Sequence, residues 1–227
     1  NPEGNIGFFS PRTNVFNIGY ARTFSSSIYG GINFKVISEN ISNLKATGIA
    51  IDAGIRYVTG EQEQVKFGIT LKNVGPVMKY KGDGLAQQAA YVTTGFIASL
   101  EERSSAFEMP SLLSIGGSYD FIFNESNKLN LGLGFTANSF SNDQYRIGLD
   151  YGMTNERMAF NVRGGYVYEK NLLDVENRSN ALVGPTAGFS IDALVGKSKN
   201  ALGVEYCARF AGIFGTIHTI GATISLK

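Results

Sequence analysis

Apolar and polar residues alternate with a period of two over stretches of about 8 to 12 residues along almost the whole chain. In residues 48–59, Ile49 and Ile51 occur at odd positions, whereas Asp52 and Arg56 occur at even ones. Successive side chains of a β-strand point to opposite faces, so this period indicates strands with one apolar and one polar face. The same pattern recurs in residues 65–72, 129–137 and 144–151.

The alternation predicts about eleven strands. They are residues 14–24, 28–38, 48–59, 65–73, 111–123, 129–138, 144–152, 158–168, 186–196, 201–210 and 216–226. Strands of soluble proteins are typically about 5 to 6 residues long, whereas a tilted strand needs about 9 to 11 residues to cross a bilayer. The predicted lengths favour an all-β, antiparallel transmembrane β-barrel over a soluble sandwich.

The predicted connections alternate between short polar turns and mostly longer loops. The short turns are residues 25–27, 60–64, 124–127, 154–157 and 197–200, and the longer loops are residues 39–47, 74–110, 139–143 and 169–185. Residues 211–215 are a short connection on the long-loop side. Outer-membrane barrels have short periplasmic turns and longer extracellular loops, so the asymmetry predicts which ends of the strands face outward.

With the short turns in the periplasm, the first predicted strand begins at the extracellular side. Bacterial single-chain barrels have an even number of strands, so we expect an odd number of further strands before this one. Residues 1–227 are accordingly interpreted as one domain, the C-terminal part of an outer-membrane barrel.

Composition narrows the function classes. The chain has 20 Lys and Arg against 19 Asp and Glu, so nucleic acid is not an expected partner. A hydrophobic fraction of 43% with 17% charged residues excludes a disordered chain. No apolar run approaches the roughly 20 residues of a membrane-spanning helix. The single cysteine, Cys207, and single histidine, His218, form no metal-binding motif, and no cofactor is expected.

Charged residues gather on the strand face opposite the apolar one. The candidate lumen charges are Asp52, Arg56, Arg146, Asp150, Arg163, Glu205 and Arg209, and the same parity holds Lys35, Glu39, Lys66, Lys72, Asp120 and Asp192. The mixed signs favour cross-strand ion pairs and an occluded lumen over an ion-selective pore, which would have one sign. The alternative is that these charges only hydrate the lumen wall.

Catalysis finds little support in the sequence, and the chain is not expected to be an enzyme. His218 is the only histidine and so the only candidate histidine base. It shares parity with Ile220 and Ile224, on the predicted lipid-facing side. An acylhydrolase site on that face is the enzymatic alternative, and an interfacial side chain is the favoured interpretation.

The longest predicted loop, residues 74–110, is too long for a plain connector, so we expect a lid or a partner-binding element. Alternatively, it is a hairpin extending two strands above the membrane. The candidate partner-binding residues of this loop and of residues 169–185 are Lys79, Tyr80, Lys81, Asp83, Tyr91, Phe96, Phe107, Leu172, Leu173 and Asp174.

Three segments in order resemble the PorV/PorQ family of outer-membrane proteins. They read YGGINFKVISE at residues 29–39, GIAIDAGIRY at 48–57 and FGITLKNVGP at 67–76, and FEMPSLL follows at 107–113. These match the family's strand that ends in lysine, its Asp-x-Gly-x-x-Tyr strand, its Asn-x-Gly-Pro strand and its Pro-led strand after the long loop. The resemblance covers residues 14–123 and is weaker beyond them.

The resemblance implies a FadL-like barrel of fourteen strands, of which about eleven lie in this sequence. It also implies a role in the type IX secretion system. Members bind the C-terminal signal domain of secreted cargo at a large outer-membrane translocon barrel and carry it to the surface attachment machinery. The family's N-terminal Asn-Pro-Ala-Gly hatch is not expected here, because Asn1-Pro2-Glu3-Gly4 lies too close to the Lys35 strand.

Two other functions stay open. One is a FadL-like transporter of hydrophobic small molecules, and the other is a monomeric diffusion pore, which the mixed lumen charges disfavour. Any of the three would have lipid or lipopolysaccharide as a neighbour.

Overall fold

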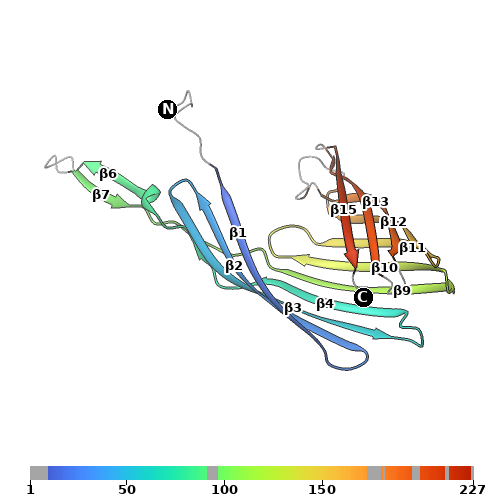
Figure 1. The fold of residues 1–227 in the computed structure, drawn as a ribbon. Helices are drawn as coiled ribbons and strands as arrows, with labels where there is room; N and C mark the ends of the chain where they lie inside the picture. The colour runs from blue at the N-terminus through green and yellow to red at the C-terminus, as the bar shows by residue number, and fades with distance from the viewer. Residues whose placement is uncertain are drawn as a thin grey trace. The chain divides into compact units, whose positions relative to one another are not determined.

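The computed structural model describes residues 10–90, 97–172, 180, 182–195, 200–212 and 215–225 of the chain. Eleven long antiparallel strands form one sheet in the order β1-β2-β3-β4-β9-β10-β11-β12-β13-β14-β15 (Figure 1). Their bounds are β1 Arg12–Thr23, β2 Ile28–Ile41, β3 Leu44–Thr59, β4 Val65–Val74, β9 Leu112–Asn124, β10 Asn127–Asn138, β11 Gln144–Thr154, β12 Met158–Glu169, β13 Gly184–Val195, β14 Asn200–Phe210 and β15 Thr216–Ser225.

Each predicted strand corresponds to one of these eleven, so the two-residue period located them correctly. The predicted faces are also confirmed: in β3, Ile51 and Ile55 are exposed, whereas Ala46 and Ala50 on the opposite parity are buried. Aliphatic and aromatic side chains are exposed in this way along all eleven strands. Among the described residues, no helix has the length and apolar character needed to cross a membrane.

The predicted loop at residues 39–47 is wrong. β2 continues to Ile41 and β3 begins at Leu44, so only Ser42 and Asn43 separate them. Ser42 has a positive φ of 52°, as tight hairpin turns require. The polar composition of this stretch resembled a loop because the hairpin lies at the predicted extracellular end, where strand residues need not be apolar.

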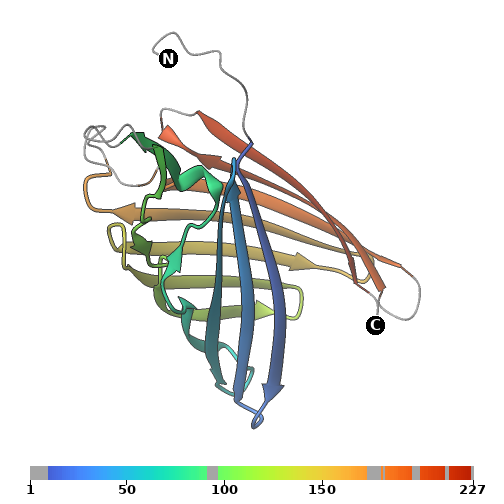
Figure 2. The same ribbon diagram turned by 90° about the vertical axis from the view of Figure 1, so that its left-hand side faces the viewer.

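The segment between β4 and β9 has structure of its own. It contains β5 (Met78–Lys79), a single 3-10 turn η1 (Asp83–Leu85), β6 (Ala86–Ala90), β7 (Ile97–Glu101) and β8 (Ala106–Phe107). β5 pairs with β8, and β6 pairs with β7, each as an antiparallel pair. The predicted lid is therefore a pair of short strands at its base followed by a hairpin (Figure 2).

The chain divides into two compact units. The first comprises Asn1–Arg22, Gly31–Ala53 and Leu71–Ser111. Its core is formed by four buried residues, with three half-buried side chains packed against them. The buried residues are Ala46, Ala50, Met78 and Met109, and the packed ones are Ile37, Tyr80 and Phe107.

The second unit comprises Thr23–Gly30, Gly54–Thr70 and Leu112–Lys227. Strands β9 to β15 pair in an unbroken antiparallel series, so residues of equal height form rows across the sheet. One apolar row is Gly117, Leu133, Ile147 and Tyr166. One row on the opposite face is Ser118, Gly132, Gly148, Gly165 and Thr186.

This two-faced sheet predicts opposite responses to the same substitution at adjacent positions. Leu149 is exposed on the apolar face, and Gly148 lies on the polar face, where the nearest atom to an added Cβ would be 3.8 Å away. We expect Leu149→Arg to lower the unfolding free energy by about 2–4 kcal/mol, because a charge near the bilayer centre faces lipid. Gly148→Arg should cost much less. Urea unfolding in lipid vesicles measures both, and equal losses would contradict the assignment of faces.

Candidate functional site

Polar residues from β2, β3 and the end of β4 meet in one cluster of the first unit. The Lys35 ammonium lies 2.7 Å from a carboxylate oxygen of Asp52. The two side chains are only 17% and 16% exposed. Asn33 donates a further hydrogen bond of 3.2 Å to Asp52. Removal of either partner of such a half-buried ion pair destabilises the fold, because the remaining charge is poorly solvated.

Asn73 joins this ion pair to the start of the segment that follows β4. Its backbone N–H donates to Asp52 over 2.8 Å, and its side-chain oxygen accepts from the Lys35 ammonium over 2.8 Å. Its side-chain amide donates a 2.9 Å hydrogen bond to the carbonyl of Pro110, and Pro110 lies at the other end of that segment. Asn73 has φ of 58°, a left-handed conformation that asparagine tolerates better than most residues.

The sequence analysis identified two of these residues, Lys35 and Asp52, without bringing them together. Lys35 and Asp52 had the lumen parity and belong to the motifs, but Asn73 was not among the candidate site residues. The signal that could have found it is an asparagine shortly before Gly75-Pro76, at the point where the strand must turn. We call Lys35, Asp52, Asn73 and Pro110 the motif cluster.

The segment between β4 and β9 folds against the polar side of β3. Met78 is 1% exposed and packs over Ala46 and Ala50. Gly48 lies between these alanines on the same parity, and a Cβ there would be 2.6 Å from Cγ of Met78. These three small residues therefore leave the space that the Met78 side chain fills, and a larger side chain at any of them would displace Met78.

Tyr80 and Phe107 hold the same segment in place. Their rings stack with centroids 5.3 Å apart, and the Tyr80 hydroxyl donates a 2.8 Å hydrogen bond to the Glu39 carboxylate at the end of β2. This hydrogen bond, helped by burial and the Glu39 charge, raises the pKa of Tyr80 above its ordinary value of 10.0.

The remaining candidate partner-binding residues divide by position. Lys79, Lys81 and Asp83 are exposed. Lys81 also forms a two-way backbone bridge with Lys45 of β3, at 2.8 and 3.0 Å. Leu172 is half-buried in the turn after β12. Tyr91, Phe96, Leu173 and Asp174 lie outside the described residues.

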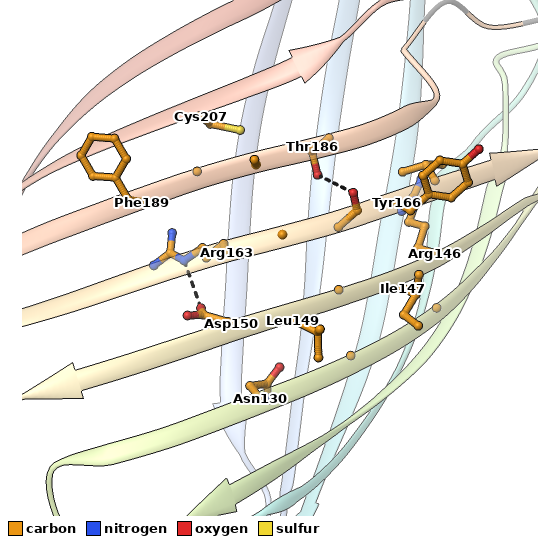
Figure 3. Close-up of a pocket in the computed structure, with 18 of the residues that line it drawn as sticks. Asn130, Arg146, Ile147, Leu149, Asp150, Arg163, Tyr166, Thr186, Phe189 and Cys207 are labelled. Atoms are coloured by element: carbon orange, nitrogen blue, oxygen red, sulfur yellow. Dashed lines mark hydrogen bonds and ion pairs between the residues drawn. The ribbon is translucent and has the colours of Figure 1, made fainter.

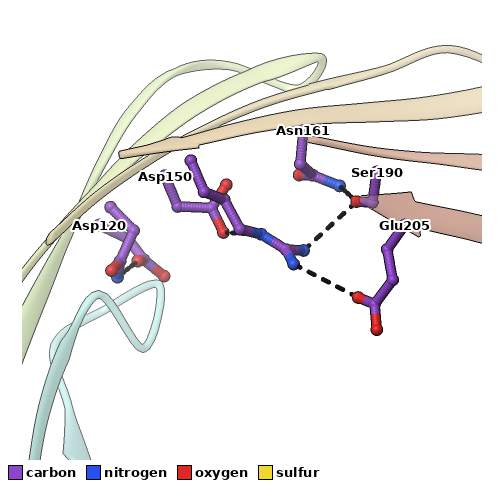
Figure 4. A network of polar contacts seen from close by, with 7 residues as sticks. Asp120, Asp150, Asn161, Ser190 and Glu205 are labelled. Carbon is purple, nitrogen blue, oxygen red and sulfur yellow. Dashed lines mark hydrogen bonds and ion pairs between the residues drawn. The ribbon is translucent and has the colours of Figure 1, made fainter. Parts of the chain in front are cut away.

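In the second unit, the predicted lumen charges form a polar network on the non-lipid face. Arg163 lies 3.0 Å from Asp150, its direct cross-strand neighbour, and 3.8 Å from Glu205 (Figure 4). It also donates to the Ser190 hydroxyl over 3.3 Å, and Asn161 donates to the same oxygen over 3.2 Å. Cross-strand pairing of mixed charges is thus confirmed here.

Two further polar groups extend along this face. Lys66 and Asn130 both contact the Asp120 carboxylate. At the other end of the strands, Arg146 donates to Gln144 over 2.8 Å, and Gln144 donates over 3.0 Å to Glu169. Glu169 is 1% exposed. Arg56 and Arg209 are exposed on the polar parity.

A groove of about 560 Å³ runs along this polar face of the second unit (Figure 3). Glycines in direct cross-strand register, Gly132, Gly148 and Gly165, line it. Arg146 and the Asp150–Arg163 pair also line the groove. Most of the remaining lining is glycine backbone and apolar side-chain atoms, so the groove combines a few charged groups with a largely apolar surface.

His218 lies on the apolar face, as its parity predicted. Its Nδ1 is 2.7 Å from the Tyr206 hydroxyl, and the two rings stack with centroids 6.0 Å apart. Cys207, next to Tyr206 in sequence, points to the polar face and is exposed. The residues described contain no group of His, Cys, Asp and Glu side chains arranged to hold a metal ion.

Comparison with known proteins identifies the fold but not a family. No protein-family model matches the chain, and no curated protein sequence matches it. Among solved structures, the Ralstonia pickettii toluene transporter TbuX is similar with a TM-score of 0.53 and 12% identity, over 94% of this chain and 67% of that one. The β domain of the Bordetella autotransporter BrkA matches with a TM-score of 0.46 and 17% identity, over 94% and 90% of the two chains.

The predicted fold class, an all-β, antiparallel transmembrane β-barrel, is confirmed by the sheet and by the TbuX similarity. Such barrels belong to the bacterial outer membrane, which confirms the expected location. The exposed apolar face is therefore the lipid-facing surface, and the face that carries the motif cluster and the charge network is the inner one.

The motif cluster predicts that Asp52 holds the segment between β4 and β9 against the inner face. We expect Asp52→Ala to lower the free energy of local opening by roughly 1–3 kcal/mol, because Lys35 and the Asn73 N–H lose a shared acceptor. Limited proteolysis should then cleave residues 75–110 roughly 5- to 150-fold faster. Asp120→Ala is the matched control, since it removes another inner-face carboxylate that is paired with a lysine. Equal cleavage in both variants would contradict the role of the cluster.

The Tyr80–Glu39 hydrogen bond predicts a pH-dependent attachment of this segment. A pKa that is higher in the folded than in the unfolded chain means that the bond stabilises fully below pH of about 10 and stops doing so as the pH rises through the raised pKa. Subtilisin, which is active at alkaline pH, should cleave the segment faster as the pH rises above about 10. Tyr80→Phe should be cleaved faster at neutral pH and should lose most of this alkaline increase, whereas Tyr57→Phe should behave as wild type. An identical alkaline profile in Tyr80→Phe would refute the interpretation.

Proposed function

We propose that the chain is a non-enzymatic outer-membrane component of the type IX secretion system, of the PorV/PorQ type. In this proposal it binds the C-terminal signal domain of secreted cargo at a large translocon barrel and passes the cargo to the surface attachment machinery. The proposal rests on the residues that carry the family resemblance and on the geometry they adopt.

The observation that carries the proposal is the convergence of the motifs. Lys35, Asp52 and Asn73 come from three separate segments that resemble the family, and Pro110 comes from a fourth. In the fold they form one hydrogen-bonded cluster at the two ends of the segment between β4 and β9. Residues that only hydrate a wall would not need this arrangement, so the cluster supports the view that the anchored segment is the functional element.

The anchored segment also offers a surface for a protein partner. Its base is fixed by Met78, Tyr80 and Phe107, whereas Ile97 and Leu100 of the β6–β7 hairpin are 63% and 50% exposed. These two apolar side chains lie outside the membrane-spanning strands, so lipid does not account for their exposure. A secreted domain or the translocon barrel is the partner that this proposal assigns to them.

A second candidate function is transport of hydrophobic small molecules. The fold similarity to TbuX, described as a toluene transporter, favours it. Three charged side chains in the groove on the inner face of the second unit, Arg146, Asp150 and Arg163, weigh against it. A path for apolar solutes has no need of charged groups, which are costly to desolvate.

The proposal predicts that the hairpin can be removed without loss of the barrel. The backbone N–H of Glu102 donates to the carbonyl of Leu85 over 2.8 Å, so a linker of about three residues can replace residues 86–101. We expect this variant to remain a heat-modifiable outer-membrane protein while recovery of cargo and translocon by affinity purification from solubilised membranes falls at least about tenfold, as loss of a binding hot spot would cause.

The matched control places the same linker in the turn between β3 and β4, in place of residues 61–63, and should leave partner recovery unchanged. Full recovery of cargo with the hairpin removed would refute the secretion proposal. Unchanged cargo recovery together with lost uptake of an apolar solute such as toluene would instead identify the transporter.

A further inference from the structure

The lipid-facing surface of the second unit is not uniform. A groove of about 790 Å³ lies on it, across β4 and β9 to β12. Apolar and aromatic side chains that point to the lipid-facing side form most of its lining. They include Phe67, Tyr119, Leu133, Ile147, Tyr166 and Tyr168. Arg146 also lines the groove, but its guanidinium hydrogen-bonds to Gln144 on the inner face.

A glycine creates the depth of this groove. Gly117 lies beside Leu133 in the lipid-facing row of cross-strand neighbours. The other residues of this row, Leu133, Ile147 and Tyr166, have large side chains. A Cβ at Gly117 would lie 3.1 Å from Cδ1 of Phe67. Any larger side chain at this position would therefore occupy the groove or displace the Phe67 ring.

Aromatic rings border the groove at one end. Phe135, Tyr145 and Tyr168 are cross-strand neighbours, with ring centroids 5.1 and 6.3 Å apart. The strand ends beyond this row lead to residues 139–143 and 170–183, on the side with the longer connections. This is the outward-facing side of an outer-membrane barrel, so the groove opens to the outer leaflet.

The chemistry at this border suits an amphipathic lipid. Tyrosine rings favour the interface between acyl chains and headgroups because one end is apolar and the other polar. Lys170 is exposed and comes two residues after Tyr168. Its ammonium group supplies a cation at headgroup level. The lipid of the outer leaflet, lipopolysaccharide, has phosphate groups at this level and several acyl chains below it.

We propose that this groove is a binding site for an acyl chain of lipopolysaccharide. A chain lying over Gly117 would contact side chains on both sides, whereas a chain on the flat part of the surface contacts one side only. Because lipid and protein are equally apolar here, the preference comes from this added van der Waals contact rather than from the hydrophobic effect. The site rests on the fold and is independent of the secretion proposal.

Native mass spectrometry of the detergent-solubilised protein with hexa-acylated lipid A tests the site. Wild type should retain a lipid A molecule, and Gly117→Leu should weaken its binding at least about fivefold, since the new side chain fills the groove. Gly164→Leu is the matched control. Gly164 lies on the same face, has no atom within 4 Å of an added Cβ, and does not line the groove, so retention should be unchanged.

Leu133→Trp supplies a second way to fill the groove if Gly117→Leu fails to fold, which heat-modified migration on a gel would show. The proposal is overturned if lipid A retention is equal in wild type and in a folded groove-filling variant, or if Gly164→Leu loses it to the same extent. It is also overturned if dipalmitoyl phosphatidylethanolamine or free palmitate is retained in preference to lipid A.

Discussion

Every backbone N–H and C=O group within a bilayer must find a partner inside the protein, because lipid offers none. In this chain the antiparallel ladder from β9 to β15 pairs these groups between each strand and the next. The ladder also fixes the side chains, since residues of each strand alternate between the lipid and the inner face. Side chains on the lipid face therefore need only be apolar, and most of the chemical specificity is confined to the inner one.

Small residues on the inner face decide what can approach the wall. In the first unit, Ala46, Gly48 and Ala50 leave room that Met78 fills, and the result is a buried anchor for the segment between β4 and β9. In the second unit, Gly132, Gly148 and Gly165 leave a groove bordered by paired charges. Small residues thus make room for another part of the chain in one unit and for a groove in the other.

The strands were predictable from sequence because their period is local and repeated. The mixed charges on one parity predicted cross-strand ion pairs in general, but not which residues pair, such as Asp150 with Arg163. The β2–β3 turn was mistaken for a loop because polar composition does not distinguish a loop from a hairpin outside the bilayer. The packing of the start of the segment after β4 against β3 could not be predicted from the sequence for another reason. It depends on the packing of Met78 against Ala46, Gly48 and Ala50, which lie about 30 residues earlier in the chain. No local sequence pattern encodes a contact over this distance.

The motif cluster shows how a polar residue on the inner parity can be more than a hydrated wall position. Alternation alone explains why Lys35 and Asp52 point inward, but it explains neither their low exposure nor their shared contacts with Asn73. An ion pair at a barrel wall gains little when water can reach it. Here the pair is only 17% and 16% exposed, and Asn73, which hydrogen-bonds to both of its members, also bonds to Pro110, so the two ends of the segment between β4 and β9 are linked to the pair. The ion pair and the attachment of this segment therefore depend on each other, and a substitution that weakens one should weaken the other. The motif cluster connects the segment to the barrel wall.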